Sequence, residues 1–90
     1  MTSTGAEKVD QTLRAVLVDV LGLSADEVGK FDEGTELFGA IPELDSMAVA
    51  GLLTEIEERL GIWIDDDEFE AEMLETYGNL LVFSRDKALQ

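Results

Sequence analysis

The sequence has no cysteine and no histidine among its 90 residues. Without cysteine the chain cannot form a disulfide, and without histidine it lacks the commonest general base and metal ligand. No apolar run approaches the roughly 18 residues that span a membrane, and residues 1–5 lack the apolar run of a secretory signal. We therefore expect a cytoplasmic protein that does not insert into a membrane and is not an enzyme.

Basic residues are also scarce. Six lysine and arginine residues stand against 21 acidic residues, which gives a net charge of -15. So negative a chain is repelled by nucleic acid and by anionic membranes, and it favours partners with basic protein surfaces. Self-repulsion on this scale also predicts a monomer.

The chain is nevertheless suited to folding, because 46% of its residues are hydrophobic. Its length allows a single domain, which we expect to include residues 1–90 with an ordered core of about residues 6–88. Apolar residues recur mainly at helical spacing. The sequence therefore predicts an all-α bundle of three main helices plus one short helix, with a long first loop.

The first helix is expected from about Ala6 to Leu21, with Gly22 as its stop. Its apolar stripe consists of Val9, Leu13, Val16, Leu17 and Val20. In the loop after it, Ser24 and Glu27 resemble a capping box for one short turn, with Val28 facing inward. Four apolar side chains are expected to anchor this loop: Phe31, Leu37, Phe38 and Ile41.

The second main helix begins where Asp45 or Ser46 can cap it, and Gly61 ends it. The buried stripe is predicted to be Val49, Leu52, Leu53, Ile56 and Leu60. The opposite face then presents Met47, Gly51, Thr54 and Glu58, flanked by Glu55 and Glu57.

The last third of the chain starts with a short apolar segment in which Trp63 is expected to be core or half-buried. The acidic run Asp65–Glu68 is interpreted as the solvated start of a short helix containing Phe69 and Met73. This run does not fit a calcium loop, because Glu70 stands where the glycine is required, so no metal site is predicted. Thr76 is expected to cap a last helix that bears Tyr77, Leu80, Leu81 and Ala88.

Ser46 is the candidate functional residue. Most serines at helix starts are only caps. Here the serine follows Asp45 and precedes Met47, whose exposed side chain suits an adaptable contact surface. The helix also presents acids outward, at Glu55, Glu57 and Glu58. This combination indicates a serine that another enzyme modifies.

At this point the chain resembles a known family, the acyl carrier proteins and the related peptidyl carrier proteins. The resemblance rests on the helix order, the long first loop, Thr35–Gly39 (Thr-Glu-Leu-Phe-Gly), Leu44-Asp45-Ser46-Met47, and the segment Glu55–Gly61 before Ile62. It implies that Ser46 accepts 4'-phosphopantetheine from coenzyme A, with Asp45 as a contributor to magnesium binding in the transferase complex. Leucine is usual where Met47 stands, and glycine is usual two residues before the aspartate.

That second position is Glu43, after Pro42, and the change bears on the backbone path before Ser46 because glutamate resists conformations that glycine permits. The sequence around the site is most similar to that of free-standing bacterial carriers encoded with exosortase and exopolysaccharide genes. The resemblance implies an acyl carrier whose partners are a phosphopantetheinyl transferase and an acyl-loading ligase or acyltransferase. Three residues are expected to line an acyl shelter: Val49, Leu53 and Ile64.

Three alternatives remain open on the sequence. The cargo could be aminoacyl or peptidyl instead of acyl. The chain could be an acidic helical adaptor without a prosthetic group. It could also be an acid/base enzyme that uses Asp45 and Glu43, although so short a bundle has little room for a deep, dry pocket.

Overall fold

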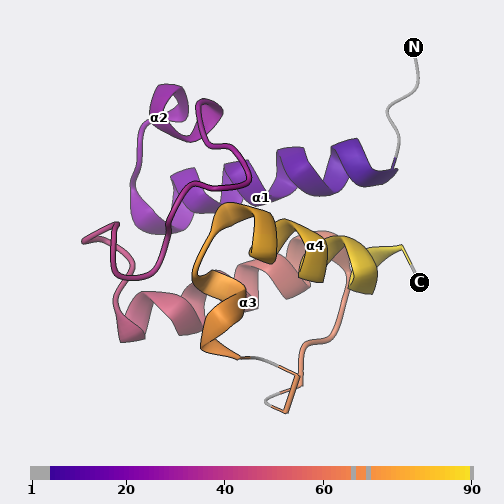
Figure 1. Cartoon of the computed structure of the whole chain (residues 1–90). Helices are drawn as coiled ribbons and strands as arrows, with labels where there is room; N and C mark the ends of the chain where they lie inside the picture. Colours follow the sequence, from indigo (N-terminus) through magenta and orange to yellow (C-terminus); the bar gives the residue numbers. More distant parts are fainter. Residues whose placement is uncertain (1–4, 66, 69, 90) are drawn as a thin grey trace.

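Three long helices form the body of the fold in the computed structural model, which describes residues 5–65, 67–68 and 70–89. The elements in chain order are α1 (Gly5–Leu21), α2 (Ala25–Gly29), α3 (Ser46–Leu60), the 3₁₀ helix η1 (Ala71–Leu74) and α4 (Tyr77–Ala88). α1 packs against α2, α3 and α4, and the first turn of α1 lies near the end of α4 (Figure 1). The described ranges contain no strand, only one isolated antiparallel bridge between Glu36 and Thr76. The predicted all-α bundle is confirmed.

The predicted helix ends are also confirmed. Gly22 and Gly61 take positive φ angles of 72° and 66° after α1 and α3, a backbone conformation that side chains resist. Ser24 Oγ accepts a hydrogen bond from the Glu27 amide, and Thr76 Oγ1 accepts one from the Asn79 amide. Each hydroxyl therefore satisfies one of the amides that a helix leaves free in its first turn.

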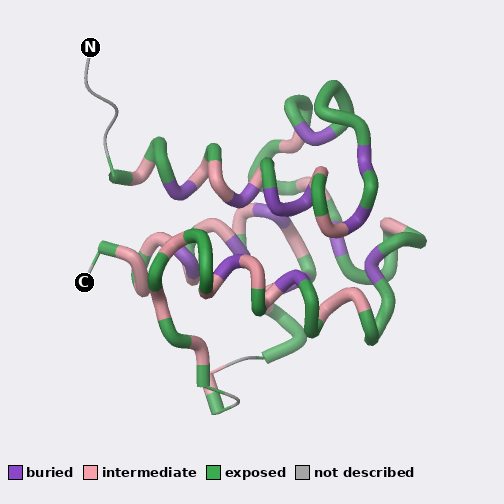
Figure 2. Tube along the Cα trace, turned by 180° about the vertical axis from the view of Figure 1, so that it is seen from behind, coloured by how far each residue is buried: buried purple, intermediate pink, exposed green. Residues whose placement is uncertain are grey.

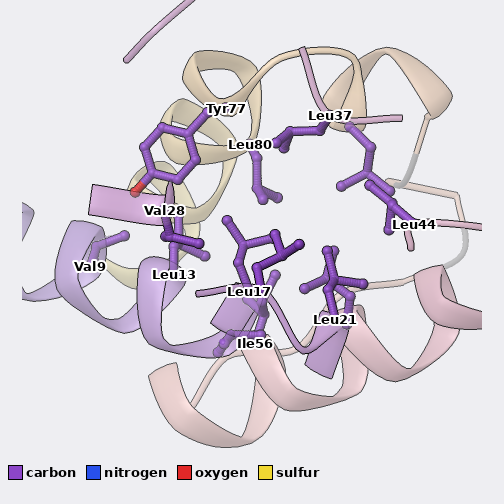
Figure 3. Close-up of a cluster of buried hydrophobic side chains, with 14 residues drawn as sticks. Val9, Leu13, Leu17, Leu21, Val28, Leu37, Leu44, Ile56, Tyr77 and Leu80 are labelled. Atoms are coloured by element: carbon purple, nitrogen blue, oxygen red, sulfur yellow. The ribbon is translucent and has the colours of Figure 1, made fainter. Parts of the chain in front are cut away.

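The hydrophobic core lies between the helices and includes two residues of the long loop, Leu37 and Leu44 (Figures 2 and 3). On α1, Val9, Leu13, Val16 and Leu17 are buried as predicted, while Leu21 is buried and Val20 only half-buried. On α3, Leu52 and Ile56 are fully buried. The other three residues of its predicted stripe are half-buried: Val49, Leu53 and Leu60.

The long loop is held to the start of α4 by main-chain hydrogen bonds. Leu37 N–H donates to Glu75 O at 3.0 Å, and Tyr77 N–H donates to Thr35 O at 2.8 Å. Gly78 N–H donates to Glu33 O, and a Cβ on Gly78 would lie 2.7 Å from that same oxygen. Only glycine allows the two segments to approach this closely.

One predicted anchor of the loop is wrong. Leu37 is fully buried and Phe31 and Ile41 are half-buried, but Phe38 is 45% exposed. Leu37 takes the inward position, and the Phe38 amide is fixed by a 2.8 Å hydrogen bond to Leu74 O. The ring of Phe38 is therefore held at the surface next to η1.

A polar network that the sequence did not indicate joins α1, α2 and α4. Arg14 donates from Nε to the Asp10 carboxylate, and from its terminal nitrogens to the carbonyls of Val28 and Phe31. Its guanidinium lies 4.8 Å from the centre of the Tyr77 ring. Tyr77 Oη donates to Asp10 Oδ1 at 2.6 Å, so burial and Asp10 together raise the pKa of Tyr77.

Two expectations for the last third of the chain are wrong. Trp63 is 72% exposed, because Ile62 and Ile64 turn toward the core and alternation along an extended segment points Trp63 outward. No helix begins at the described residues of the acidic run, Asp65, Asp67 and Glu68; η1 begins only at Ala71 and contains Met73. Phe69, which the sequence placed in that short helix, and Asp66 lie outside the described residues.

Candidate functional site

Ser46 is the first residue of α3, and its side chain is exposed. The choice between two caps is settled in favour of Asp45, whose Oδ1 accepts a 2.8 Å hydrogen bond from the Ala48 amide. Within the described part of the chain, no residue forms a hydrogen bond with Ser46 Oγ. The hydroxyl is therefore free to act as an acceptor of a transferred group.

The backbone before Ser46 is fixed by a buried anchor. Leu44 is 3% exposed, and its amide donates to Ile41 O at 3.0 Å. Among the described residues, only glycines have a positive φ. Glu43 therefore does not adopt a backbone conformation that favours glycine. The positive φ of this loop is at Gly39, where it is 93°. Glutamate at this position is thus accommodated without strain.

Two hollows meet at Ser46. The first is a cavity of about 210 Å³ with an almost entirely apolar lining: Phe38, Val49, Ala71 and Leu74, with Ser46 at its edge. The second is a groove of about 450 Å³ along α3, which also begins at Ser46 and Val49. It continues past Leu53 and Glu57 to Ile64 and Asp65.

The three predicted shelter residues all line this second groove. Its wall is partly polar, because Thr54, Glu57 and Asp65 contribute to it. The more apolar cavity was not predicted, since Ala71 and Leu74 reach it only through the path of the chain after α3. The one local feature of the sequence that pointed to this cavity is Phe38, next to Gly39 in the long loop.

The outer face of α3 divides into free and engaged side chains. Met47 is 86% exposed and Glu58 is exposed, as predicted for a contact surface. Glu55 accepts from Arg59 Nε at 3.0 Å, and Arg59 also pairs with Asp19 of α1 at 2.8 Å. These two carboxylates raise the pKa of Arg59, the hydrogen bond to Asp19 contributing most. Glu57 accepts from the Ile64 amide, so its carboxylate faces the groove.

The acidic run after Ile64 has a structural role at Glu68. Lys87 Nζ of α4 lies 2.6 Å from Glu68 Oε2, and this contact lowers the pKa of Glu68. The described residues contain no group of three acidic side chains arranged to hold a metal ion. None of the helices in these described ranges is both long and apolar enough to cross a bilayer.

Comparison with known proteins was made on sequence and on structure. A family model described as a phosphopantetheine attachment site matches residues 11–81. An acyl carrier protein of Nitratidesulfovibrio vulgaris strain DP4 is 35% identical over 60 residues, which is 67% of this chain and 74% of that protein. An acyl carrier protein of the Miyazaki F strain of the same species is 37% identical over 60 residues. This alignment also covers 67% of this chain and 74% of that protein.

Among solved structures, the solution NMR structure of a holo acyl carrier protein from Nitrosomonas europaea superposes with a TM-score of 0.81 at 38% identity. The match covers 91% of this chain and 96% of that one. The helices, the exposed serine at the start of α3 and these similarities agree, and the chain belongs to the acyl carrier protein family, whose members carry covalent 4'-phosphopantetheine.

Proposed function

We propose that Ser46 is the residue that bears 4'-phosphopantetheine and that the chain thereby carries acyl groups between partner enzymes. The observation that supports this most directly is the exposed hydroxyl of Ser46 at the start of α3, without a hydrogen-bond partner in the described ranges. Ser24 also lies at a helix start, but its hydroxyl is occupied by the cap of α2. The attached group supplies a terminal thiol, which the cysteine-free chain lacks.

The N-terminus of α3 suits the phosphate of such a group. The first amides of a helix have no intrahelical acceptor, and the helix dipole favours negative charge beside them. The first turn of α3 contains no acidic side chain, and the Asp45 carboxylate beside it is partly compensated by the Ala48 amide that it caps. Asp45 uses Oδ1 for its cap, which leaves Oδ2 available to help hold magnesium in the transferase complex.

The transfer itself needs a base from outside the chain. Ser46 Oγ forms a bond to the phosphorus of coenzyme A that bears the pantetheine, and the phosphoanhydride bond breaks to release adenosine 3',5'-bisphosphate. The hydroxyl proton passes to a base of the transferase, because this chain has no histidine and its neighbouring carboxylate, Asp45, is used for the cap of α3 and for magnesium. The chain acts as the substrate of this step and not as its catalyst.

The apolar cavity beside Ser46 is the better shelter for an alkyl cargo. A carbon atom of an alkyl chain, with its hydrogens, occupies roughly 30 Å³, about the volume of a water molecule. A cavity of 210 Å³ therefore holds about seven such carbon atoms. Phe38 and Leu74 supply its apolar walls. A fatty or polyketide acyl group fits this lining better than a charged aminoacyl group does.

We propose further that the chain is a cytoplasmic monomer whose partners present basic surfaces. These are a phosphopantetheinyl transferase and an acyl-loading ligase or acyltransferase. Met47 and Glu58 are the most accessible parts of the proposed docking face on α3. Glu55 and Glu57 lie beside them, in contacts with Arg59 and Ile64.

Intact mass spectrometry tests the assignment of Ser46. Incubation with coenzyme A, magnesium and a transferase of broad specificity is expected to add one phosphopantetheine to the parent protein. Ser46→Ala is expected to abolish the gain, and Ser24→Ala, at the other serine that begins a helix, is expected to keep it. A gain that persists in Ser46→Ala would contradict the assignment, and no gain in the parent would favour the adaptor alternative.

A further inference from the structure

The groove along α3 has dimensions that match a tethered ligand. It begins at Ser46 and reaches Glu57, which follows eleven residues later on the same helix. At about 1.5 Å per residue these positions are about 16 Å apart along the axis. A phosphopantetheine arm has roughly fourteen bonds along its chain from the serine oxygen to the sulfur. Four to five residues of polypeptide have about as many backbone bonds, and when extended they span about 16 Å. The extended arm therefore ends where the groove ends.

The chemistry of the groove matches the arm as well as its length. The arm alternates amide groups with short apolar links, and the groove sets apolar Leu53 and Ile64 beside the polar groups of Thr54 and Asp65. Leu53 is half-buried yet does not pack against the buried core, so its side chain has apolar surface to offer a ligand.

The carboxylates at the far end are held in position. Glu57 Oε2 accepts from the Ile64 amide at 2.8 Å, and Asp65 Oδ1 accepts from the indole N–H of Trp63. Each carboxylate retains oxygen lone pairs for the donors of a ligand. A thiol placed between two carboxylates is favoured in its neutral form over the thiolate.

We propose that this groove binds the unloaded arm of the holo protein, with its thiol beside Glu57 and Asp65 and in a less reactive state than a free thiol. The inference rests on the attachment at Ser46 proposed above. The occupant is the arm and not a separate molecule, because the tether at the mouth of the groove keeps its local concentration high.

Two kinds of measurement on the holo protein test the proposal. Conversion from apo to holo form is expected to shift the backbone amide NMR signals of Leu53, Ile64 and Asp65, and not only those next to Ser46. Trp63 is the only tryptophan and is hydrogen-bonded to Asp65, so its fluorescence is expected to change as well. In a reaction with uncharged iodoacetamide at about pH 7.5, the thiol is expected to be about fivefold slower than free pantetheine, because only the thiolate reacts.

Matched variants separate binding in the groove from general effects. Ala50 is exposed and lines the groove, whereas Ala15 is exposed on α1 and does not. Ala50→Phe is expected to abolish the distant shifts and to restore the alkylation rate, and Ala15→Phe is expected to do neither. Glu57→Gln with Asp65→Asn keeps both hydrogen-bond acceptors and is expected to restore most of the rate.

Mass analysis of the same samples distinguishes the two proposals. If Ser46 gains no phosphopantetheine, the proposed function fails and the groove inference with it. If Ser46 is modified but shifts stay confined to its immediate neighbours, only the groove inference is overturned. Shifts at Leu53 and Ile64 that appear only after acylation would also overturn it, since the groove would then bind cargo and not the arm.

Discussion

At the scale of single residues, neighbouring acids on α3 differ in what they do. Glu58 is exposed, whereas Glu55 is tied to Arg59 and Glu57 to the Ile64 amide. A charge with no structural contact influences association more than folding, because exposed ion pairs contribute little to stability. Glu58 is therefore the cleanest position at which to test the docking face.

Glu58→Lys is expected to slow loading by the transferase by about two- to tenfold at low salt, with helicity and melting nearly unchanged. Loading rates should be measured over a salt series, in which the difference should shrink as screening increases. Asp86 is exposed on α4, so Asp86→Lys makes the same change in charge away from α3 and is expected to have a smaller effect. Equal rates for Glu58→Lys and the parent at every salt concentration would rule out this face.

At the scale of elements, Tyr77 joins α4 to α1. It is 1% exposed, donates to Asp10 and lies against the Arg14 guanidinium. Its pKa is raised in the folded state by burial first and by Asp10 second. Because the folded pKa lies above the unfolded one, this contribution is complete below about pH 10 and is lost as pH rises through the folded pKa.

The expected outcome is an alkaline loss of stability. The free energy of unfolding should fall as pH rises above about 10, and Tyr77→Phe should weaken this dependence. At neutral pH Tyr77→Phe should lower the free energy of unfolding by about 1 kcal/mol, the typical net contribution of one hydrogen bond. Tyr77 is the only tyrosine, so ultraviolet absorbance reports its ionisation directly. Ionisation near pH 10 while the protein stays folded would contradict the raised pKa.

At the scale of the whole molecule, the acidic charge is largely uncompensated. The chain has 21 acidic and six basic residues, and the described chain measures 35 × 33 × 21 Å. The screening length is about 30 Å at 0.01 M salt and about 10 Å at 0.1 M. Repulsion therefore acts across the whole bundle at low salt and only between neighbours at moderate salt.

The melting temperature is accordingly expected to rise from low to moderate sodium chloride. Magnesium at matched ionic strength should raise it further, because a divalent ion can bridge neighbouring carboxylates such as Asp65 and Asp67. Melting curves under the three conditions make the comparison. A melting temperature that does not change with salt would show that repulsion does not limit the fold, and an equal effect of both salts would exclude only bridging.

Much of the fold is determined locally and could be predicted from the sequence. The stripe from Val9 to Leu17, the caps at Ser24 and Thr76 and the stops at Gly22 and Gly61 depend on spacing within a few residues. The same holds for the position of Ser46, because Asp45 caps α3 from the adjacent residue and Leu44 is an apolar anchor beside it.

How segments distant in the sequence meet depends on the packing of the whole chain. The exposed rings of Phe38 and Trp63, the pairing of Glu68 with Lys87 and the Asp10–Tyr77 hydrogen bond depend on where other elements lie. The two hollows at Ser46 likewise need η1 and residues 64–65 to return to the side of α3. Periodicity identifies which face of a helix is apolar, but packing between elements decides which of those side chains the core covers and which remain to line a groove.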